Sequence, residues 1–143
     1  MTEPRTAVET ALRALRARDR SAAELESRLR GRGVDETEQR ETLELLSRLG
    51  YVDDERFATL RAAALAARSC GDELIRDDLE RRGVAGSTID AALAELEPQQ
   101  ERADRIVANR GRSAKTARFL AARGFAEDVI EGAFAWEDAE GIG

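Results

Sequence analysis

Residues 29–34 read Leu-Arg-Gly-Arg-Gly-Val, and the same pattern returns at residues 79–84 and 120–125. Each copy begins with leucine and ends with arginine, glycine and an apolar residue. Glycine adopts the left-handed conformation without a steric penalty, and an apolar residue that follows it folds back onto the helix it has just left. A basic residue before the glycine suits the negative end of the helix dipole. The pattern therefore predicts three similar helix ends.

Other apolar residues recur in register when the three copies are aligned on Gly33, Gly83 and Gly124. Positions eighteen before and ten after the glycine are apolar in every copy: Leu15, Leu65 and Ile106, then Leu43, Leu93 and Phe134. An accidental match in a helical Ala/Leu/Arg-rich chain is the alternative. The register favours repeats of about forty to fifty residues, each a three-helix unit. We predict three tandem helix-turn-helix-like repeats, at residues 1–50, 51–97 and 98–143, in an elongated, curved, right-handed array.

The composition favours an all-α protein. Hydrophobic residues make up 42% of the 143 residues and charged residues 36%, but aromatic residues only 4%. Ala, Leu, Arg and Glu favour helix, and only Pro4 and Pro98 interrupt it. Capping signals such as Ser21 with Glu24 mark helix starts. We expect helices near residues 5–18, 22–31, 36–49, 54–68, 72–82, 99–110, 113–123 and 127–136, and a further helix around Ile89 to Leu96.

The absence of histidine excludes several kinds of site. It removes Ser-His-Asp and Cys-His catalysis, the usual zinc sites and the commonest general base. Cys70 is the one cysteine, so no internal disulfide forms, and we expect it to be a small buried filler. No apolar run reaches membrane-spanning length, and the N-terminus lacks a signal-peptide layout. We predict a cytoplasmic protein with no cofactor, no metal and no catalytic residues.

The link between the first two repeats has its own pattern at residues 50–58. Gly50 ends a helix, and Asp53 or Asp54 caps the next. These two carboxylates have no base or metal partner in the sequence, so a capped turn is the better interpretation. We expect a small apolar cluster at the break, formed by Tyr51, Val52 and Phe57.

Charge is unevenly distributed over a chain whose net charge is −6. The middle repeat is acidic and should repel DNA. Residues 102–126 hold seven basic side chains and one acidic one, Asp104. A basic block of this kind is either a solvated face or a contact for phosphate or an acidic protein surface. The candidate partner-binding or DNA-binding residues are Arg102, Arg105, Arg110, Arg112, Lys115, Arg118 and Arg123.

Several phrases together resemble the RecX family of recombinase regulators. They are Ala-Leu-Arg-Ala-Leu at residues 11–15, Gly-Tyr-Val-Asp-Asp at residues 50–54 with Arg-Phe-Ala at residues 56–58, and the three glycine endings. The resemblance covers about residues 7–134. Gln39 and Thr116 depart from the apolar residues at the equivalent positions of other repeats. Ser-Cys-Gly at residues 69–71 stands where the family tends to have basic residues, which puts in doubt a nucleic-acid contact through the middle repeat.

The resemblance implies a non-enzymatic, cytoplasmic protein that acts as a monomer and binds the RecA filament on single-stranded DNA. Such proteins lodge in the filament groove and inhibit or modulate its ATPase, strand-exchange and co-protease activities. Single-stranded or duplex DNA is a further candidate partner, and no membrane is implied. A tri-helical transcriptional regulator stays open as the alternative, with a recognition helix that begins near Ser113 and carries Arg112, Lys115 and Arg118.

Two aromatic residues near the end of the chain, Phe125 and Trp136, could stack on bases. Their helical spacing and apolar neighbours favour core packing instead. The polar residues after Trp136 predict a frayed tail over residues 137–143.

Overall fold

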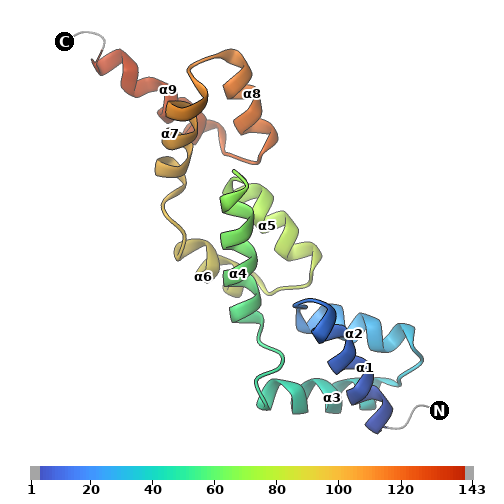
Figure 1. The fold of residues 1–143 in the computed structure, drawn as a ribbon. Helices are drawn as coiled ribbons and strands as arrows, with labels where there is room; N and C mark the ends of the chain where they lie inside the picture. Colours follow the sequence, from blue (N-terminus) through green and yellow to red (C-terminus); the bar gives the residue numbers. More distant parts are fainter. Residues whose placement is uncertain (1–3, 141–143) are drawn as a thin grey trace.

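The computed structural model describes the backbone of residues 4–140 and the side chains of residues 7–135. Within the described residues the chain is entirely helical and contains no strand, which confirms the all-α prediction. Figure 1 shows the helices: α1 (Pro4–Ala17), α2 (Ala22–Gly31), α3 (Glu36–Arg48), α4 (Asp54–Ala67), α5 (Asp72–Arg81), α6 (Gly86–Ala94), α7 (Gln99–Arg110), α8 (Ala114–Ala122) and α9 (Glu127–Glu140).

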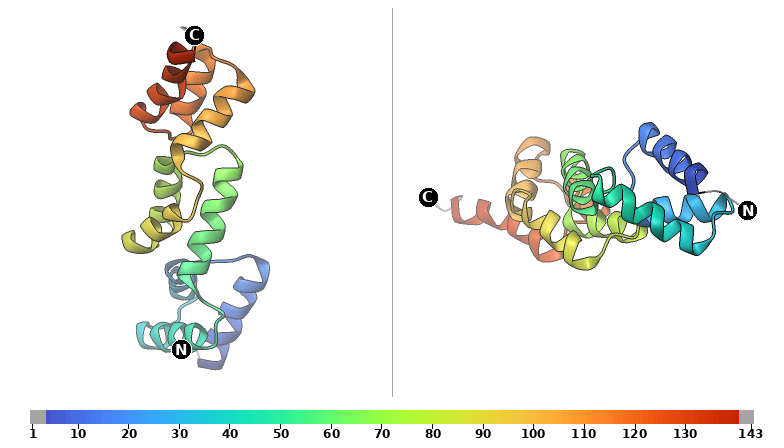
Figure 2. Two further views of the ribbon diagram at one scale, coloured as in Figure 1. Left: turned by 90° about the vertical axis from the view of Figure 1, so that its left-hand side faces the viewer. Right: turned by 90° about the horizontal axis from the view of Figure 1, so that it is seen from below.

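The helices pack in three sets that follow one another along an elongated molecule (Figures 1 and 2). We call them bundle 1 (α1–α3), bundle 2 (α4–α6) and bundle 3 (α7–α9). Within each bundle, all three helices pack against one another. Whether each bundle folds as an independent domain, with the boundaries at residues 50 and 97, stays a prediction.

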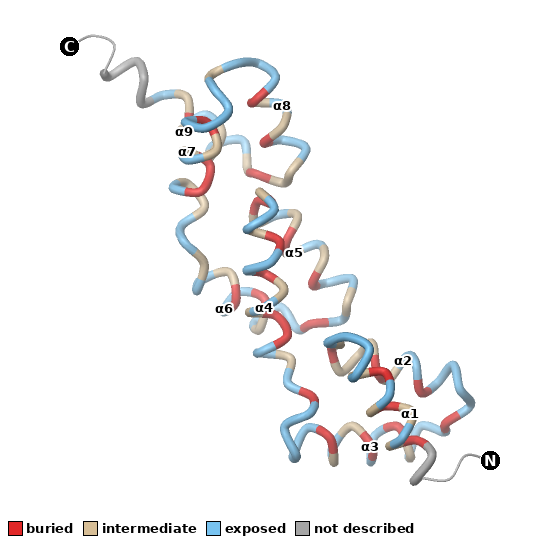
Figure 3. Tube along the Cα trace, viewed as in Figure 1, coloured by how far each residue is buried: buried red, intermediate tan, exposed pale blue. Residues whose placement is uncertain are grey.

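Each bundle has its own apolar core, and Figure 3 shows the buried residues distributed along the stack. The leucine four residues before each glycine is fully buried. The apolar residue directly after each glycine is also almost completely buried. At the positions eighteen before and ten after the glycine, Leu65 is buried in its core, and the other five residues are partly buried against the cores. Gln39, which departs from the apolar pattern, is buried and donates from Nε2 to the Val34 carbonyl at 2.8 Å. This hydrogen bond satisfies the amide inside the core.

The three helix ends have the geometry that the repeated sequence predicts. Gly33, Gly83 and Gly124 have φ angles of +82°, +79° and +84°. The Val34 N–H donates to the Leu29 carbonyl and the Gly33 N–H to the Arg30 carbonyl, both at 3.1 Å. This pair of hydrogen bonds is a Schellman motif, and the other two ends repeat it.

The helix starts also match their sequence signals. Ser21 and Glu24 form a reciprocal capping box at α2. Asp53, rather than Asp54, caps α4 by accepting from the Arg56 N–H at 3.1 Å. Asp54 accepts instead from the Ala22 N–H at 2.8 Å, so it links α4 to the start of α2 in the preceding bundle.

The second helices of the bundles, α2, α5 and α8, follow one another along one side of the molecule (Figure 1). The end of each later helix meets the start of the earlier one. A Cβ atom placed on Gly83 would lie 2.3 Å from the Ala23 Cβ, and one on Gly124 would lie 2.5 Å from the Leu74 nitrogen. Gly33 has nothing within 4 Å of such an atom. The glycines therefore serve the bundle junctions as well as the helix ends.

Some expectations need correction. Tyr51 is 55% exposed and does not join Val52 and Phe57, which are buried. The Tyr51 and Val52 N–H groups both donate to the Leu46 carbonyl, at 2.8 Å and 3.2 Å, but only the Val52 side chain turns into the core. Phe125 and Cys70 are buried as predicted. Helix α9 continues to Glu140, beyond its expected end, whereas the Trp136 side chain and residues 141–143 of the predicted tail lie outside the described residues.

Two features of the described part of the chain bear on function. No helix there is both long enough and apolar enough to cross a membrane. No group of three or more acidic or cysteine side chains in that part is placed to hold a metal ion.

Candidate partner interface

Arg102 is a structural residue of the junction between bundles 2 and 3, although it belongs to the predicted contact set. It is 7% exposed. Its guanidinium donates to the Cys70 carbonyl at 3.0 Å, to the Glu97 carbonyl at 2.9 Å and to the Asp72 carboxylate. These contacts use all three of its nitrogens, so Arg102 is not available to a partner.

Arg105 and Arg112 lie nearer the surface but are engaged within the chain. Arg105 is exposed and forms an ion pair with Glu97. The hydrogen bond to Glu97 raises the pKa of the Arg105 guanidinium above its usual value. Arg112 is half-buried and donates to the Phe134 carbonyl at 3.0 Å, which joins the start of α8 to α9. A partner that used either residue would have to compete with these contacts.

Arg110 and Arg123 both make cation–π contacts with one aromatic ring. Their guanidinium carbons are 3.7 Å and 5.1 Å from the centroid of Phe119. Arg123 also donates to the Arg68 carbonyl at 3.1 Å, across the junction to bundle 2. Cation–π contacts hold the side chains while their charge still faces solvent. Arg110, which is exposed, can therefore take part in a contact without losing its place.

Lys115 and Arg118 are exposed members of the predicted set whose side chains are not engaged within the described part of the chain. Both are exposed on α8, where a spacing of three places them on the same face. Neither side chain forms a hydrogen bond or an ion pair with any other described residue. Ser113 caps the helix by accepting from the Thr116 N–H at 3.1 Å, which fixes where the two cations project. The candidate interface in bundle 3 is therefore Lys115 and Arg118, flanked by Arg110.

Sequence reasoning missed a second concentration of arginine, at the junction between bundles 1 and 2. Arg82 donates to Glu24 at 2.9 Å and to Asp78 at 3.0 Å. Arg61 donates twice to Asp78 at 2.9 Å, and Ser21 donates to the Arg82 carbonyl. The hydrogen bond from Arg61 lowers the pKa of Asp78, and the same bond raises the pKa of Arg61. The only sequence signal for this cluster was the arginine before each glycine. From the sequence, that arginine was attributed to the helix dipole alone.

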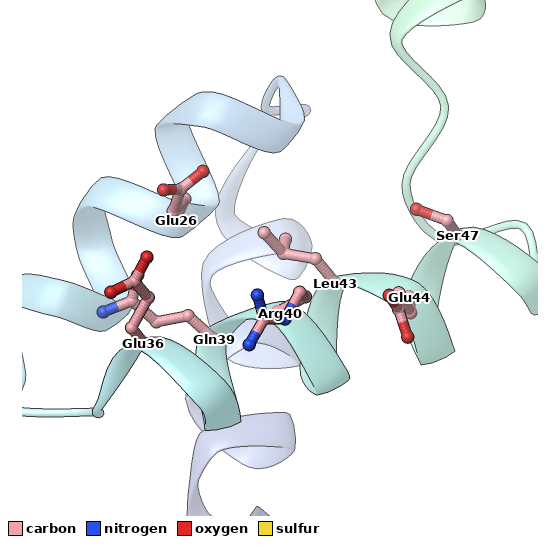
Figure 4. A pocket seen from close by; sticks show the side chains of 7 residues that line it. All are labelled: Glu26, Glu36, Gln39, Arg40, Leu43, Glu44 and Ser47. Atoms are coloured by element: carbon pink, nitrogen blue, oxygen red, sulfur yellow. The ribbon is translucent and has the colours of Figure 1, made fainter.

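A hollow of about 470 Å³ lies between α2 and α3 on bundle 1. Figure 4 shows the side chains around it: Glu26, Glu36, Gln39, Arg40, Leu43, Glu44 and Ser47. Three carboxylates and one arginine give it an acidic rim, with Leu43 as its apolar element. Its charge is opposite to that of α8, so an anionic partner would not enter here.

Known proteins match this chain in sequence. A family model described as the first three-helix domain of RecX matches residues 7–54, and one described as the second three-helix domain of RecX matches residues 53–93. The protein named "Regulatory protein RecX" from Halorhodospira halophila is 33% identical over 142 residues, which cover 92% of this chain and 88% of the relative. The chain belongs to the RecX family. A relative of the same name from Mycolicibacterium smegmatis is 36% identical, but the match covers 73% of this chain and 60% of that longer protein.

Solved RecX structures share the fold. The crystal structure of RecX from Lactobacillus salivarius has a TM-score of 0.81 at 21% identity, and the match covers 95% of this chain and 97% of that one. A second structure, of "regulatory protein RecX", has a TM-score of 0.76 at 22% identity and covers 90% of this chain. Coverage of this extent reaches well into bundle 3, so the whole three-bundle stack is common to these proteins.

Proposed function

We propose that this RecX-family protein is a cytoplasmic monomer that binds the RecA filament on single-stranded DNA and inhibits or modulates its activities. These activities are the ATPase, strand exchange and the SOS co-protease function in DNA repair and recombination. Membership of the RecX family, whose curated relatives are named regulatory proteins, carries the proposal. The protein acts by binding and not as an enzyme, in keeping with a sequence that has no histidine.

The shape of the molecule supports a filament as the partner. Three bundles stacked end to end form a long, narrow body that can follow another polymer. Lys115 and Arg118 add an exposed basic face on α8 at one end of this body. We propose that this face contacts the filament, either its acidic protein surface or its DNA.

The transcriptional-regulator alternative has less support from α8. A recognition helix reads base edges with several polar side chains. The exposed residues of α8 are Lys115, Arg118 and a group of alanines: Ala114, Ala121 and Ala122. Two cations and three methyl groups suit contact with a charged surface better than base-specific hydrogen bonding.

The test is RecA ATPase on single-stranded DNA, titrated with this protein in substoichiometric amounts. We expect the steady-state rate to fall, because bound regulator destabilises the active filament. The variant Lys115→Glu/Arg118→Glu should need about tenfold more protein for the same effect, since reversing two charges removes a contact that screened Coulomb forces favour. The variant Arg40→Glu/Arg48→Glu, with the same charge change on exposed residues of α3, should behave like the wild type.

Two results would contradict the proposal at different points. An unchanged ATPase, without binding to the filament or to free RecA, would remove RecA as the partner and favour a screen of duplex DNA. A normal fall in ATPase with the Lys115→Glu/Arg118→Glu variant would keep RecA and remove α8 from the interface.

A further inference from the structure

A cleft of about 410 Å³ lies where the start of α2 meets the end of α5, at the junction of bundles 1 and 2. Arginine dominates its lining. Residues of both bundles form it: Arg20, Ala23, Glu24, Ser27, Arg28, Arg81, Arg82 and Gly83. Four of these side chains are cationic and one is anionic. The cleft is therefore strongly positive within a chain whose net charge is −6.

The one carboxylate of the cleft is already engaged. Glu24 accepts from Arg82 at 2.9 Å and from the Ser21 N–H at 3.0 Å, and it lies 3.6 Å from Arg18. Arg82 in turn is shared with Asp78. Glu24 and Arg82 neutralise each other, and three cations of the lining remain without a carboxylate partner among the described residues: Arg20, Arg28 and Arg81.

Arg20 shows that this positive charge is concentrated. Its Nε donates to the Ala14 carbonyl at 3.1 Å, which fixes the guanidinium at the cleft. Burial is the largest cause of the lowered pKa of Arg20, and the neighbouring charges of Arg18 and Arg28 lower it further against a smaller opposite effect of Glu24. An anion in the cleft would relieve this repulsion.

We infer that the cleft binds phosphate groups of a nucleic-acid backbone. Guanidinium groups match the bidentate geometry of phosphate oxygens, and Ser27 adds a hydroxyl donor. The lining has no aromatic ring on which a base could stack, and its apolar part is only Ala23 and Gly83. A peptide would need apolar anchor pockets that this cleft lacks. The contact is therefore to the backbone and independent of sequence.

This site is separate from the basic face of α8 and does not depend on the RecA proposal. The exposed residues of the intervening helix α5 include Glu73, Asp77 and Glu80, which repel phosphate. A nucleic-acid strand would therefore meet two basic contacts with an acidic stretch between them. The cleft also gives bundle 2, acidic as a whole, a contact with nucleic acid through the end of α5.

The experiment measures binding of the 143-residue protein to a fluorescein-labelled oligothymidylate, without RecA, by anisotropy over a salt series. The cleft variant is Arg28→Gln/Arg81→Gln, which leaves the ion pairs of Glu24 and Asp78 intact. The matched control is Arg40→Gln/Arg48→Gln, which removes two exposed arginines of α3. Circular dichroism and thermal unfolding verify that both variants fold.

The expected result follows from counterion release. Loss of two phosphate contacts lowers the salt slope by about 1.4 and the affinity at 0.1 M salt by roughly twentyfold, while the control stays within about twofold. Equal affinity and slope for the two variants would overturn the inference. So would a cleft variant that binds the oligonucleotide normally but binds a RecA filament weakly, because the cleft would then hold protein carboxylates. A wild-type protein that binds the oligonucleotide through the cleft but leaves RecA ATPase unchanged would contradict only the proposed function.

Discussion

The two bundle junctions use the same arginine–glycine helix end but hold it differently. At the junction of bundles 1 and 2, each contact involves a side chain: Arg82 donates to Glu24, Ser21 donates to the Arg82 carbonyl, and Asp54 accepts from the Ala22 N–H. At the junction of bundles 2 and 3, the backbones also bond to each other directly, beside the side-chain contacts of Arg102 and Arg123. One repeated sequence element therefore gives one junction joined through side chains and one in which backbone hydrogen bonds are added to them.

The close approach at the second junction depends on two glycines. The Gly71 N–H donates to the Arg123 carbonyl at 2.7 Å, and the Glu73 N–H donates to the Gly124 carbonyl at 3.1 Å. A Cβ atom on Gly71 would lie 2.5 Å from the Gly124 oxygen. Gly71 also explains why Ser-Cys-Gly at residues 69–71 cannot be exchanged freely for basic residues. We expect this junction to be the stiffer of the two.

The largest effect should come from Gly124→Ala. The new Cβ would collide with the backbone of Leu74, and the residue would still need a positive φ. We expect a loss of about 4 kcal/mol in the free energy of unfolding, or separation of bundle 3 from bundle 2. Urea unfolding followed by circular dichroism measures this. Gly33→Ala is the matched control, because it keeps the left-handed strain without the collision and should cost about 1 kcal/mol.

The equivalent substitution at the junction of bundles 1 and 2 distinguishes the two junctions. In Gly83→Ala the collision is with the Ala23 Cβ, a side-chain atom that can be removed. The double variant Gly83→Ala/Ala23→Gly should regain about 1 kcal/mol over Gly83→Ala, even though glycine weakens the helix. No substitution can relieve Gly124→Ala in this way. Equal losses for Gly33→Ala and Gly124→Ala would show that the second junction is not closely fitted.

A smaller effect is expected for Arg102→Met. The methionine keeps much of the volume but leaves the Asp72 carboxylate and two carbonyls at a largely buried junction without their donor. Loss of one partner of such a pair costs about 3 kcal/mol. Thermal and urea unfolding measure the change, with Arg105→Met as the control for an exposed ion pair. Similar stabilities of the two variants would mean that Arg102 does not hold the junction.

The smallest effect, and the one that depends on pH, is expected for Asp78→Asn. Its hydrogen bonds with Arg61 lower the pKa of Asp78 in the folded state. A lowered pKa stabilises the fold above the unfolded pKa of about 4, and this contribution disappears as the pH falls through the lower folded value. We therefore expect Asp78→Asn to cost about 2 kcal/mol at neutral pH and progressively less in acid.

The control for this prediction is Asp90→Asn, since the ion pair of Asp90 with Arg76 is exposed. It should change the free energy of unfolding by less than about 0.5 kcal/mol at any pH. Free energies of unfolding measured between pH 3 and pH 7 would show the two profiles. A constant difference between wild type and Asp78→Asn over this range would contradict the role of its ionised carboxylate.

Much of the fold could be predicted from local sequence signals. The capping box at Ser21 and the three glycine endings fix where helices begin and end, because each satisfies backbone groups within a few residues. The largest error in a predicted helix end is at α9. The helix was expected to end at Trp136, but no glycine or proline follows there to end it. Tyr51 shows the same limit. Its apolar character suggested burial, but of the two neighbouring residues in this turn only Val52 reaches the core, and the Tyr51 ring is exposed.

The candidate site was predicted less well. The basic block of residues 102–126 was visible as composition, but composition does not show which charges have partners. The Arg102 side chain is buried at the junction of bundles 2 and 3, whereas Lys115 and Arg118 are exposed. The cleft arginines were not visible at all, because Arg20 and Arg28 are about sixty residues from Arg81 and Arg82 and form no motif.

The sequence by itself determined the helices, their ends, the all-α class and the threefold register, since these follow from interactions between residues close along the chain. Only the tertiary structure decided how each arginine–glycine end meets the preceding bundle, which arginines are buried and which converge on a cleft. Those outcomes depend on the packing of helix ends that lie forty or more residues apart in the sequence, where a single Cβ atom or carboxylate determines the fit.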